Sequence, residues 1–566
     1  MFSEKRNIQQ LTSLIVKYGI TEAVICPGSR NSAIVHNLKA AKLKCYEITD
    51  ERSAGFFAIG LMEANGGKPV AICVTSGSAV LNLAPAVCEA FYRNLPLLAI
   101  TADRPERWIG QMDGQTMPQP NAFGNMVAKC VSLPEPTDEE TAWYCNRLIN
   151  EALIEQKKTN RPVHINVPIT EPMFSFNEAC LPDERLISFV GNSNLECEFT
   201  DKMKDVWRKA EKAIIIIGQM LPKEMEQCSY YLKVLYGKGS IIIADNLSNI
   251  HTVKELNGCY IGNFDEMIAR NTFETPELVI TIGGHIVSKR LKQFLRKNAP
   301  KHHWHISNVG ELADLFMCCT DLIYSIPASF LHTLSLLDSG NDSKRKDYQN
   351  RMQAESCKTT DIKNSIMNGN LEFCDIKALH TFLPHINADW HIHVANSSMV
   401  RSLQSFFCGN NPVHCNRGVN GIEGSSSAAV GYWVASCTPT LLLTGDLSFF
   451  YDKNALWNNY VKAPQSPLRI LIFNNGCGQI FHHLPGLEHS PYLHESIAAS
   501  HTTTAEGIAL ECGAQYLSAN NENELISLIP TFMSPSKDVK VLEVFTDSAI
   551  DEKEFKQYGY NLINQM

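Results

Sequence analysis

Leu441-Leu442-Leu443-Thr444-Gly445-Asp446-Leu447-Ser448 is an apolar run that stops abruptly at oxygen-bearing side chains, and Arg469-Ile470-Leu471-Ile472-Phe473-Asn474-Asn475-Gly476-Cys477-Gly478 repeats this pattern downstream. Short apolar runs separated by a helix-length segment are typical of neighbouring strands in a buried parallel sheet, whose carboxyl ends form the ligand-binding edge. We therefore expect Asp446 and Asn475 to share that edge and, with a main-chain carbonyl near Cys477, to bind Mg²⁺. Taken alone, the same residues are also typical of ordinary turns at strand ends.

Apolar runs alternate with helix-length segments along most of the chain, which is the pattern of doubly wound α/β domains. With 566 residues, the chain exceeds the roughly 250–300 residues at which a single core stops growing. We therefore predict three α/β domains, each with a doubly wound, Rossmann-like parallel sheet. Their predicted bounds are 1–180, 195–337 and 371–566, and the polar, charge-mixed segment 338–370 is predicted to be an exposed linker and helix.

The composition excludes several classes of protein. The net charge of −9, without a basic stripe interleaved with aromatic residues, argues against a nucleic-acid partner. No apolar stretch approaches the roughly twenty residues of a membrane span, and residues 1–7 carry mixed charge without the apolar block of a secretory signal. We therefore expect a soluble, cytoplasmic protein.

The nineteen cysteines include no Cys-x-x-Cys pair, and most lie in apolar runs such as Ala71-Ile72-Cys73-Val74. Paired spacing would be expected of zinc ligands, and a disulfide framework would be expected in a small secreted chain. Buried, reduced thiols are the prediction here.

Gly445-Asp446 and Asn474-Asn475, separated by one helix-length segment, resemble the cofactor motif of thiamine diphosphate enzymes. The wider match is to one family, the 2-succinyl-5-enolpyruvyl-6-hydroxy-3-cyclohexene-1-carboxylate (SEPHCHC) synthases of menaquinone biosynthesis, and it covers nearly the whole chain in the expected order. The further matching stretches are Pro27-Gly28-Ser29-Arg30, Asp50-Glu51-Arg52, Val74-Thr75-Ser76-Gly77-Ser78-Ala79, Thr101-Ala102-Asp103-Arg104-Pro105, Ser288-Lys289-Arg290-Leu291 and Asn416-Arg417-Gly418.

This resemblance implies a transferase that depends on thiamine diphosphate and on Mg²⁺, for which Mn²⁺ can substitute. Such an enzyme decarboxylates 2-oxoglutarate and adds the resulting succinic semialdehyde–cofactor carbanion to isochorismate by 1,4-addition, which gives SEPHCHC and CO₂. The first domain would bind the pyrimidine ring, and the third would bind the diphosphate and the metal. In this superfamily the first domain of one subunit usually meets the third domain of its partner, so a homodimer is implied, and a tetramer stays open.

The resemblance also assigns residues to the cofactor. Glu51 matches the catalytic carboxylate that faces the aminopyrimidine ring, with Asp50 as the weaker candidate, although a carboxylate at the start of an apolar helix is also favoured by the helix dipole alone. Ile422 matches the apolar side chain beneath the cofactor, and a plain buried loop Ile is its alternative. The metal would be bound by Asp446, Asn475 and the Cys477 carbonyl. The other cofactor-binding residues implied are Gly445, Leu447, Ser448, Gln479, Ile480 and Phe481.

Several basic residues match family positions that bind substrate. Guanidinium groups bind carboxylates in bidentate fashion, and both family substrates are dicarboxylates, although any one Arg or Lys is more often a solvated surface charge. The substrate-binding residues implied are Ser29, Arg30, Arg104, Gln115, Lys289, Arg290, Ser397, Arg401 and Arg417. The sequence departs from the family at Gly114, where related sequences can carry Asn, and at Cys477, where Gly is frequent.

Two alternatives stay open. The chain could be another thiamine enzyme, such as an acetolactate synthase or a 2-oxo acid decarboxylase, although the basic residues argue against small monocarboxylate substrates. It could also be a non-catalytic binding paralogue that keeps the fold. The joint presence of Glu51, Asp446 and Asn475 argues against that second alternative.

Overall fold

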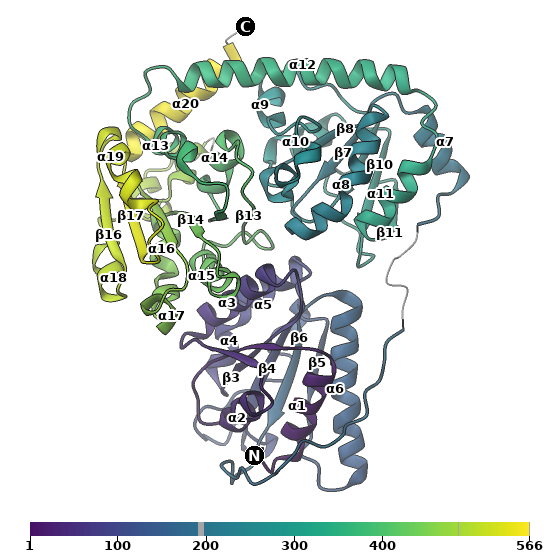
Figure 1. The fold of residues 1–566 in the computed structure, drawn as a ribbon, viewed down its shortest axis with the longest axis vertical. Coiled ribbons are helices and arrows are strands. Elements are labelled where there is room, and N and C mark those ends of the chain that lie inside the picture. Colours follow the sequence, from purple (N-terminus) through teal and green to yellow (C-terminus); the bar gives the residue numbers. More distant parts are fainter. Residues whose placement is uncertain (191–196, 485, 565–566) are drawn as a thin grey trace.

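Three parallel β-sheets, each flanked by helices, form the protein (Figure 1). The structure is a computed structural model that describes residues 1–190, 197–484 and 486–564. All strand pairings within the three sheets are parallel, which confirms the predicted fold class. In the described part of the chain, no helix combines the length and the apolar character needed to cross a bilayer.

The first sheet has the strand order β2-β1-β3-β4-β6-β5. Its strands are β1 (Glu22–Ile25), β2 (Lys44–Glu47), β3 (Val70–Val74), β4 (Leu97–Asp103), β5 (Lys129–Ser132) and β6 (Val163–Pro168). The helices around it are α1 (Arg6–Lys17), α2 (Ser32–Ala40), α3 (Glu51–Ala64), α4 (Ser78–Asn82), α5 (Ala84–Tyr92) and α6 (Glu139–Thr159). Every residue of β3 and β4 is buried, as expected of central strands covered on both faces.

The second sheet has the order β11-β10-β9-β7-β8. Its strands are β7 (Ala213–Ile217), β8 (Ile241–Ala244), β9 (Leu278–Ile282), β10 (His302–Ser307) and β11 (Asp321–Tyr324). Its helices are α7 (Asp201–Lys209), α8 (Pro222–Gly237), α9 (Phe264–Ala269), α10 (Lys289–Lys297) and α11 (Pro327–Leu336). Four consecutive isoleucines make β7 a strand that is buried throughout, because β-branched side chains suit the pleated interior of a sheet.

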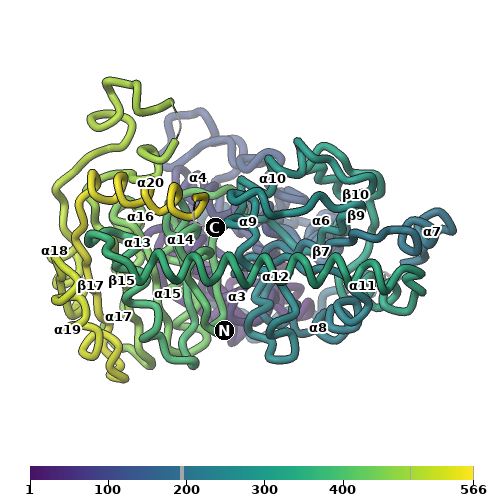
Figure 2. Tube along the Cα trace, turned by 90° about the horizontal axis from the view of Figure 1, so that it is seen from above, coloured from purple at the N-terminus to yellow at the C-terminus, as the bar shows by residue number. Residues whose placement is uncertain are grey.

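A long helix, α12 (Asp342–Met367), connects the second sheet to the third (Figures 1 and 2). Its first half is anchored by Arg345, which is fully buried, stacks over the ring of Trp207 and donates from Nε to the carbonyl of Ala210 at 2.7 Å. Its second half packs against α9 and the C-terminal helix. The segment predicted as linker and helix is therefore one continuous helix for most of its length, and the domain bounds proposed from the sequence stay a proposal.

The third sheet has the order β13-β12-β14-β15-β17-β16. Its strands are β12 (His391–Val394), β13 (Val413–His414), β14 (Thr440–Gly445), β15 (Leu468–Asn474), β16 (Gln515–Ala519) and β17 (Val539–Phe545). Its helices are α13 (Asp375–Phe382), α14 (Ser398–Phe406), α15 (Ser425–Ser436), α16 (Asp446–Tyr451), α17 (Asn459–Lys462), α18 (Glu506–Glu511), α19 (Glu522–Phe532) and α20 (Ser548–Asn564). The apolar run before Asp446 and the apolar run before Asn475 form the adjacent strands β14 and β15.

Helices α3 and α15 hold the first and third domains together (Figure 1). A Cβ atom added to Gly60 of α3 would lie 2.1 Å from the carbonyl oxygen of Ala428, and one added to Gly431 of α15 would lie 2.2 Å from that of Phe57. The two backbones therefore touch at both points, where only glycine leaves enough room.

The nineteen cysteines are free thiols, but only seven of them are buried. The prediction of burial is therefore wrong for the exposed residues Cys180, Cys357, Cys408 and Cys437. The apolar character of the neighbouring sequence does not fix which side of a helix or strand faces solvent.

We predict that Gly431→Ala lowers the free energy of unfolding by about 3 kcal/mol, because its methyl group overlaps the Phe57 carbonyl and the helices must separate. Gly559→Ala is the matched control, since this helical glycine in α20 has no atom within 4 Å of an added Cβ. The urea unfolding midpoints of both variants and the parent protein measure the effect. Equal midpoints for the two variants would contradict close backbone packing at this helix pair.

Candidate functional site

The carboxyl ends of β14 and β15 are joined through Asp446. Strand β14 ends at Gly445 and α16 begins at Asp446, so the carboxylate lies at the first turn of a helix, where free N–H groups point toward it. Asp446 is 3% exposed; its Oδ1 accepts from the N–H of Leu447 at 2.6 Å, and its Oδ2 accepts from the N–H of Gly476 at 2.9 Å. Gly476 directly follows Asn475, so the two predicted metal ligands are neighbours.

The amide of Asn475 is oriented by a residue that the sequence analysis missed. Its Nδ2 donates to Oδ2 of Asp375 at 2.9 Å, and Thr546 Oγ1 donates to the other oxygen of Asp375 at 2.7 Å. Burial raises the pKa of Asp375 to about 6. Because Asp375 accepts from the nitrogen, the amide oxygen of Asn475 is left facing Cys477, whose N–H donates to it at 3.2 Å.

His501 is a second missed neighbour. Its Nε2 lies 3.3 Å from Oδ2 of Asp446, and the interaction with this carboxylate raises the pKa of His501 above its usual value. No local pattern marks His501, which lies in the irregular segment before α18. The contact shows that the Asp446 carboxylate attracts positive charge.

The donor set fits a hard divalent cation. It consists of the carboxylate of Asp446, the amide oxygen of Asn475 and the carbonyl of Cys477, which accepts from Gln479 N at 3.1 Å and keeps a second lone pair. A Cβ added to Gly445 would meet no atom within 4 Å, so the backbone beside Asp446 faces open space. Gly476 has a φ of +74°, which lets the chain reverse directly after Asn475.

The residues that follow the donor set form a short helical turn, Gln479–His483. Gln479 is buried and donates from Nε2 to the carbonyl of Ser548 at 3.0 Å, which ties this turn to α20. Phe481 packs against Gly478, and Ile480 is half-buried beside it. These predicted cofactor residues therefore border the donor set, and Gln479 is anchored away from it.

The loop 416–424, which we call the Arg417 loop, lies beside α16. Ser448 donates from Oγ to the carbonyl of Ile422 at 2.6 Å, so the predicted cofactor residues Ser448 and Ile422 are in contact. Asn396 Nδ2 donates to the carbonyls of Asn416 and Gly421 at 2.6 and 2.7 Å. The side chain of Ile422 is 37% exposed, so it is available to a ligand, unlike an ordinary buried loop Ile.

Glu51 lies at the start of α3, as predicted. Asp50 caps this helix by accepting from Ser53 N at 3.0 Å, and it also accepts from Asn454 Nδ2 at 2.6 Å, which accounts for Asp50 structurally. The carboxylate of Glu51 accepts from Asn82 Nδ2 at 3.0 Å. Across residues 1–190, 197–484 and 486–564, no hydrogen bond or ion pair joins Glu51 to Asp446 or Asn475.

Two predicted substrate residues of the first domain converge on one carboxylate. Arg30 and Arg104 lie 3.3 and 3.8 Å from Oε1 of Glu171, and Arg104 also pairs with Asp113 at 2.9 Å. Arg104 Nε donates to the carbonyl of Gly114 at 2.9 Å. This contact uses only the backbone of Gly114, and an added Cβ there would meet nothing within 4 Å. The departure at Gly114 therefore leaves the Arg104 contact in place.

The hydroxyl-bearing and amide residues predicted beside these cations are placed in loops. Ser29 is exposed and lies immediately before Arg30. Gln115 has a φ of +56°, and its backbone packs against Gly77. Ser397 has a φ of +73° and precedes α14, where its carbonyl accepts a hydrogen bond from Arg401.

A cluster of cationic side chains lies between the second and third domains. Burial raises the pKa of Asp265. The positive charges of Arg290 and Arg401 act in the opposite direction. Burial and then the charge of Arg417 lower the pKa of Arg401, so these two guanidinium groups are neighbours. Lys289, the first residue of α10, is exposed at the edge of this cluster.

Lys292 belongs to the same cluster and was missed by the sequence analysis. Its pKa is lowered, first by burial and then by the charge of Arg417, while Asp245 acts in the opposite direction. The only sequence signal is its position three residues after Lys289, on the same side of α10. We define the cationic cluster as Arg290, Lys292, Arg401 and Arg417.

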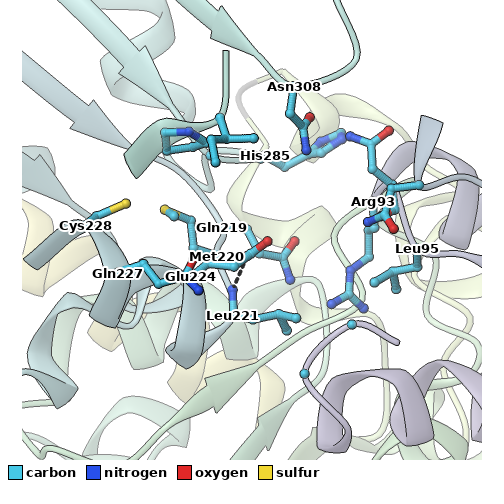
Figure 3. A pocket seen from close by; sticks show the side chains of 18 of the residues that line it. Arg93, Leu95, Gln219, Met220, Leu221, Glu224, Gln227, Cys228, His285 and Asn308 are labelled. Atoms are coloured by element: carbon cyan, nitrogen blue, oxygen red, sulfur yellow. Dashed lines mark hydrogen bonds between the residues drawn. The ribbon is translucent and has the colours of Figure 1, made fainter. Parts of the chain in front are cut away.

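A cavity of about 270 Å³ lies elsewhere, where the three domains meet (Figure 3). Arg93 and Leu95 contribute from the first domain, Gln219 and His285 from the second, and His414 from the third. None of the site residues predicted from the sequence is among the described residues that line it. The predicted site is instead a set of side chains at sheet edges and domain junctions.

Comparison with known proteins shows the family to which the chain is similar. The family model "Thiamine pyrophosphate enzyme, N-terminal TPP binding domain" matches residues 7–125, and "Middle domain of thiamine pyrophosphate" matches residues 188–332. The chain is 43% identical to a 2-succinyl-5-enolpyruvyl-6-hydroxy-3-cyclohexene-1-carboxylate synthase of Phocaeicola vulgatus, over the full length of both. Proteins of that name from Bacteroides thetaiotaomicron and Flavobacterium psychrophilum are 43% and 34% identical, over 99% and 98% of this chain and 100% and 98% of their own lengths.

One buried acid beside the site gives a pH-dependent prediction. Asp452 follows α16 and accepts from the N–H and the hydroxyl of Ser427 at 2.7 and 2.8 Å; burial raises its pKa to about 7. Since its pKa in the unfolded chain is about 4, folding is favoured at low pH, and this contribution declines as the pH rises from about 4 to 7.

We predict that Asp452→Asn removes this dependence. Between pH 5 and pH 8, the parent protein should lose stability relative to the variant, by at most about 2.7 kcal/mol, because about two units of the shift in pKa fall in this range. Urea unfolding midpoints of the two proteins at both pH values measure the difference. Parallel pH profiles would show that the acid does not titrate in this range.

Proposed function

Because this chain belongs to the 2-succinyl-5-enolpyruvyl-6-hydroxy-3-cyclohexene-1-carboxylate synthase family of thiamine pyrophosphate enzymes, we propose that it catalyses the reaction for which its relatives are named. The substrates would be 2-oxoglutarate and isochorismate, and the products SEPHCHC and CO₂, within menaquinone biosynthesis. One observation carries the proposal above all. The oxygen donors of Asp446 and Asn475 are held together at one sheet edge, where they fit a divalent cation.

Asp446, Asn475 and the carbonyl of Cys477 would hold Mg²⁺, or Mn²⁺ in its place, and through it the diphosphate of the cofactor. When bound, thiamine diphosphate would supply a nucleophilic carbon and a thiazolium ring into which the electron pair released by loss of CO₂ is delocalised. Ile422 would support the cofactor rings from the Arg417 loop, close to Ser448. The open space beside Gly445 gives the diphosphate room to approach the first turn of α16.

Glu51 would exchange a proton with the pyrimidine ring nitrogen. Its carboxylate is engaged by the single donor Asn82, so one oxygen is left for the ring. Because Glu51 and Asp446 are not joined within one chain, we propose that the active site forms in a homodimer, where the first domain of one subunit faces the third domain of the other. A tetramer built from such dimers and a cytoplasmic location remain predictions.

The cationic residues would hold the carboxylates of the two substrates. The pair Arg30 and Arg104 faces the carboxylates of Asp113 and Glu171, and the four cations of the cationic cluster have Asp245, Asp265 and Glu89 among their acidic neighbours. A dicarboxylate that enters such a site replaces water around the cations and is held by charge-assisted hydrogen bonds, each of about 1.5–3 kcal/mol. The same charges would stabilise negative charge that develops on the substrates during the reaction.

The proposal is tested by mixing the purified protein with thiamine diphosphate, Mg²⁺, 2-oxoglutarate and isochorismate, and by following isochorismate by absorbance and the product by mass. Isochorismate loss that requires both 2-oxoglutarate and the cofactor, with formation of the succinyl adduct, is expected. CO₂ release from other 2-oxo acids without the adduct would indicate another thiamine enzyme. Cofactor binding without turnover would indicate a non-catalytic paralogue.

Glu51→Gln is the matched variant for this assay. It keeps the size and one hydrogen-bond acceptor but cannot exchange the proton, so turnover should fall by at least about a hundredfold while cofactor affinity changes little. Asp446→Ala should instead abolish Mg²⁺-dependent retention of the cofactor. Full activity of Glu51→Gln would refute the proton-transfer role.

Lys292→Ala tests the cationic cluster. Loss of one charge-assisted contact should raise KM for a dicarboxylate substrate roughly tenfold, equivalent to about 1.4 kcal/mol, with little change in the unfolding midpoint. Lys297→Ala, at the exposed end of the same helix, is the control and should leave KM unchanged. An unchanged KM for both substrates in Lys292→Ala would remove this residue from the substrate site.

A further inference from the structure

We propose that Glu89, on α5 of the first domain, is a positioning residue that sets the Arg417 loop of the third domain. The loop carries Arg417 and Ile422, whose substrate and cofactor roles rest on the proposed function. The contacts between Glu89 and the loop do not depend on that function. In the described structure no hydrogen bond or ion pair joins the side chain of Glu89 to the metal donors or to the side chain of Arg417, although burial raises the pKa of Glu89 and the positive charge of Arg417 lies close enough to act in the opposite direction.

The carboxylate of Glu89 holds two consecutive backbone groups of the loop. Its Oε1 accepts from the N–H of Gly418 at 2.8 Å, and its Oε2 accepts from the N–H of Val419 at 2.9 Å. Glu89 is 1% exposed, so its carboxylate is shielded from water and relies on these two N–H groups and on Arg93 for partners. A carboxylate that accepts two N–H groups fixes both the position and the direction of the peptide between them.

The backbone of the loop also lies directly on α5. A Cβ added to Gly418 would lie 2.6 Å from the carbonyl oxygen of Glu89 and 2.8 Å from its Oε2. A Cβ added to Gly424 would overlap the ring of Phe56, which belongs to α3. The first domain therefore contacts the loop near its beginning and at its end, and in both places the contact requires glycine.

Arg93 holds Glu89 in place. It directly follows α5, four residues after Glu89; its Nη2 donates to Oε1 of Glu63 at 2.6 Å, and its Nε lies 3.9 Å from Oε1 of Glu89. Its Nη1 donates to Oδ1 of Asn416, the first residue of the loop, at 3.4 Å. Burial raises the pKa of Glu89, while Arg93 and the two loop N–H groups act in the opposite direction and favour the carboxylate.

The remaining contacts of the loop come from its own domain. Asn396 accepts from Arg417 Nη1 at 2.9 Å and donates to the carbonyl of Gly421, and Ser448 donates to the carbonyl of Ile422. Arg417 and Ile422 are thus held on one side by the third domain and on the other by Glu89. Loss of the two hydrogen bonds to Glu89 would leave the third-domain contacts in place. The peptide at Gly418, which directly follows Arg417, would then be free to rotate.

The test compares Glu89→Gln with Glu63→Gln in the full-length enzyme with thiamine diphosphate and Mg²⁺. Both changes remove one buried carboxylate that pairs with Arg93, but only Glu89 accepts from the loop. In Glu89→Gln, one loop N–H faces an amide NH₂ group instead of an oxygen. We expect at least tenfold faster hydrogen exchange at the amides of Gly418 and Val419, a KM for a dicarboxylate substrate raised about fivefold or more, and a lower kcat. Glu63→Gln should show none of these three changes.

Gly418→Ala provides a second route that leaves the buried charges unchanged. Its methyl group pushes the loop away from α5, so it should reproduce the faster exchange and the kinetic changes even where Glu89→Gln fails to fold. Unchanged amide exchange in Glu89→Gln, or unchanged KM and kcat in an active Glu89→Gln enzyme, would overturn the positioning role. Absence of synthase activity in the parent protein would instead refute the proposed function, and amide exchange would still decide whether Glu89 holds the loop.

Discussion

The backbone contact between α3 and α15 is the constraint on which the rest of the structure depends. Gly60 and Gly431 let the two helices touch, and this contact fixes the first domain against the third. With the helices in place, Asp50 reaches Asn454, Phe56 covers Gly424, and Glu89 reaches the Arg417 loop. A longer interhelical distance would break all of these contacts together, because hydrogen bonds weaken steeply beyond about 3.2 Å.

The basic side chains differ in how far neighbouring groups compensate their charge. Arg345 is surrounded by backbone carbonyls and an aromatic ring, and Arg93 is paired with two carboxylates, as expected where an unpaired charge would cost several kcal/mol. In the cationic cluster, two of the four basic side chains, Arg290 and Arg401, are exposed, and the acidic neighbours that act on the cluster include Asp245, Asp265 and Glu89. Burial lowers the pKa of Lys292, which is half-buried, and also that of Arg401, although Arg401 keeps an exposed surface. An anionic substrate would add negative charge beside these cations, in keeping with the role in dicarboxylate binding proposed for the cluster.

Two kinds of contact also arrange the sheet edge that carries Asp446 and Asn475, the proposed metal ligands. Asp446 and Asn475 are brought together by strand pairing, whereas their orientation comes from Asp375, Thr546 and the backbone of Gly476. Neighbours of this kind fix the ligand atoms of a metal site before the ion arrives and tune their basicity. Glu51 is excluded from this network within one chain. The separation of the predicted proton-transfer group from the metal donors is the structural reason for proposing a dimer.

The sequence by itself determined the three parallel sheets, the start of α3 at Glu51 and the position of Asp446 and Asn475 at adjacent strand ends. These features follow from local rules, namely apolar runs of strand length, helix-length spacing and the exposure of side chains at the carboxyl ends of parallel strands. Only the tertiary structure decided that Asp375 orients Asn475, that His501 pairs with Asp446, that Lys292 joins the cationic cluster and that Glu89 holds the Arg417 loop. The partners in these contacts are as far apart as 100 positions for Asp375 and Asn475 and 329 for Glu89 and Gly418. No sequence periodicity or fixed spacing marks such pairs, because the packing of elements that are distant in the sequence brings them together.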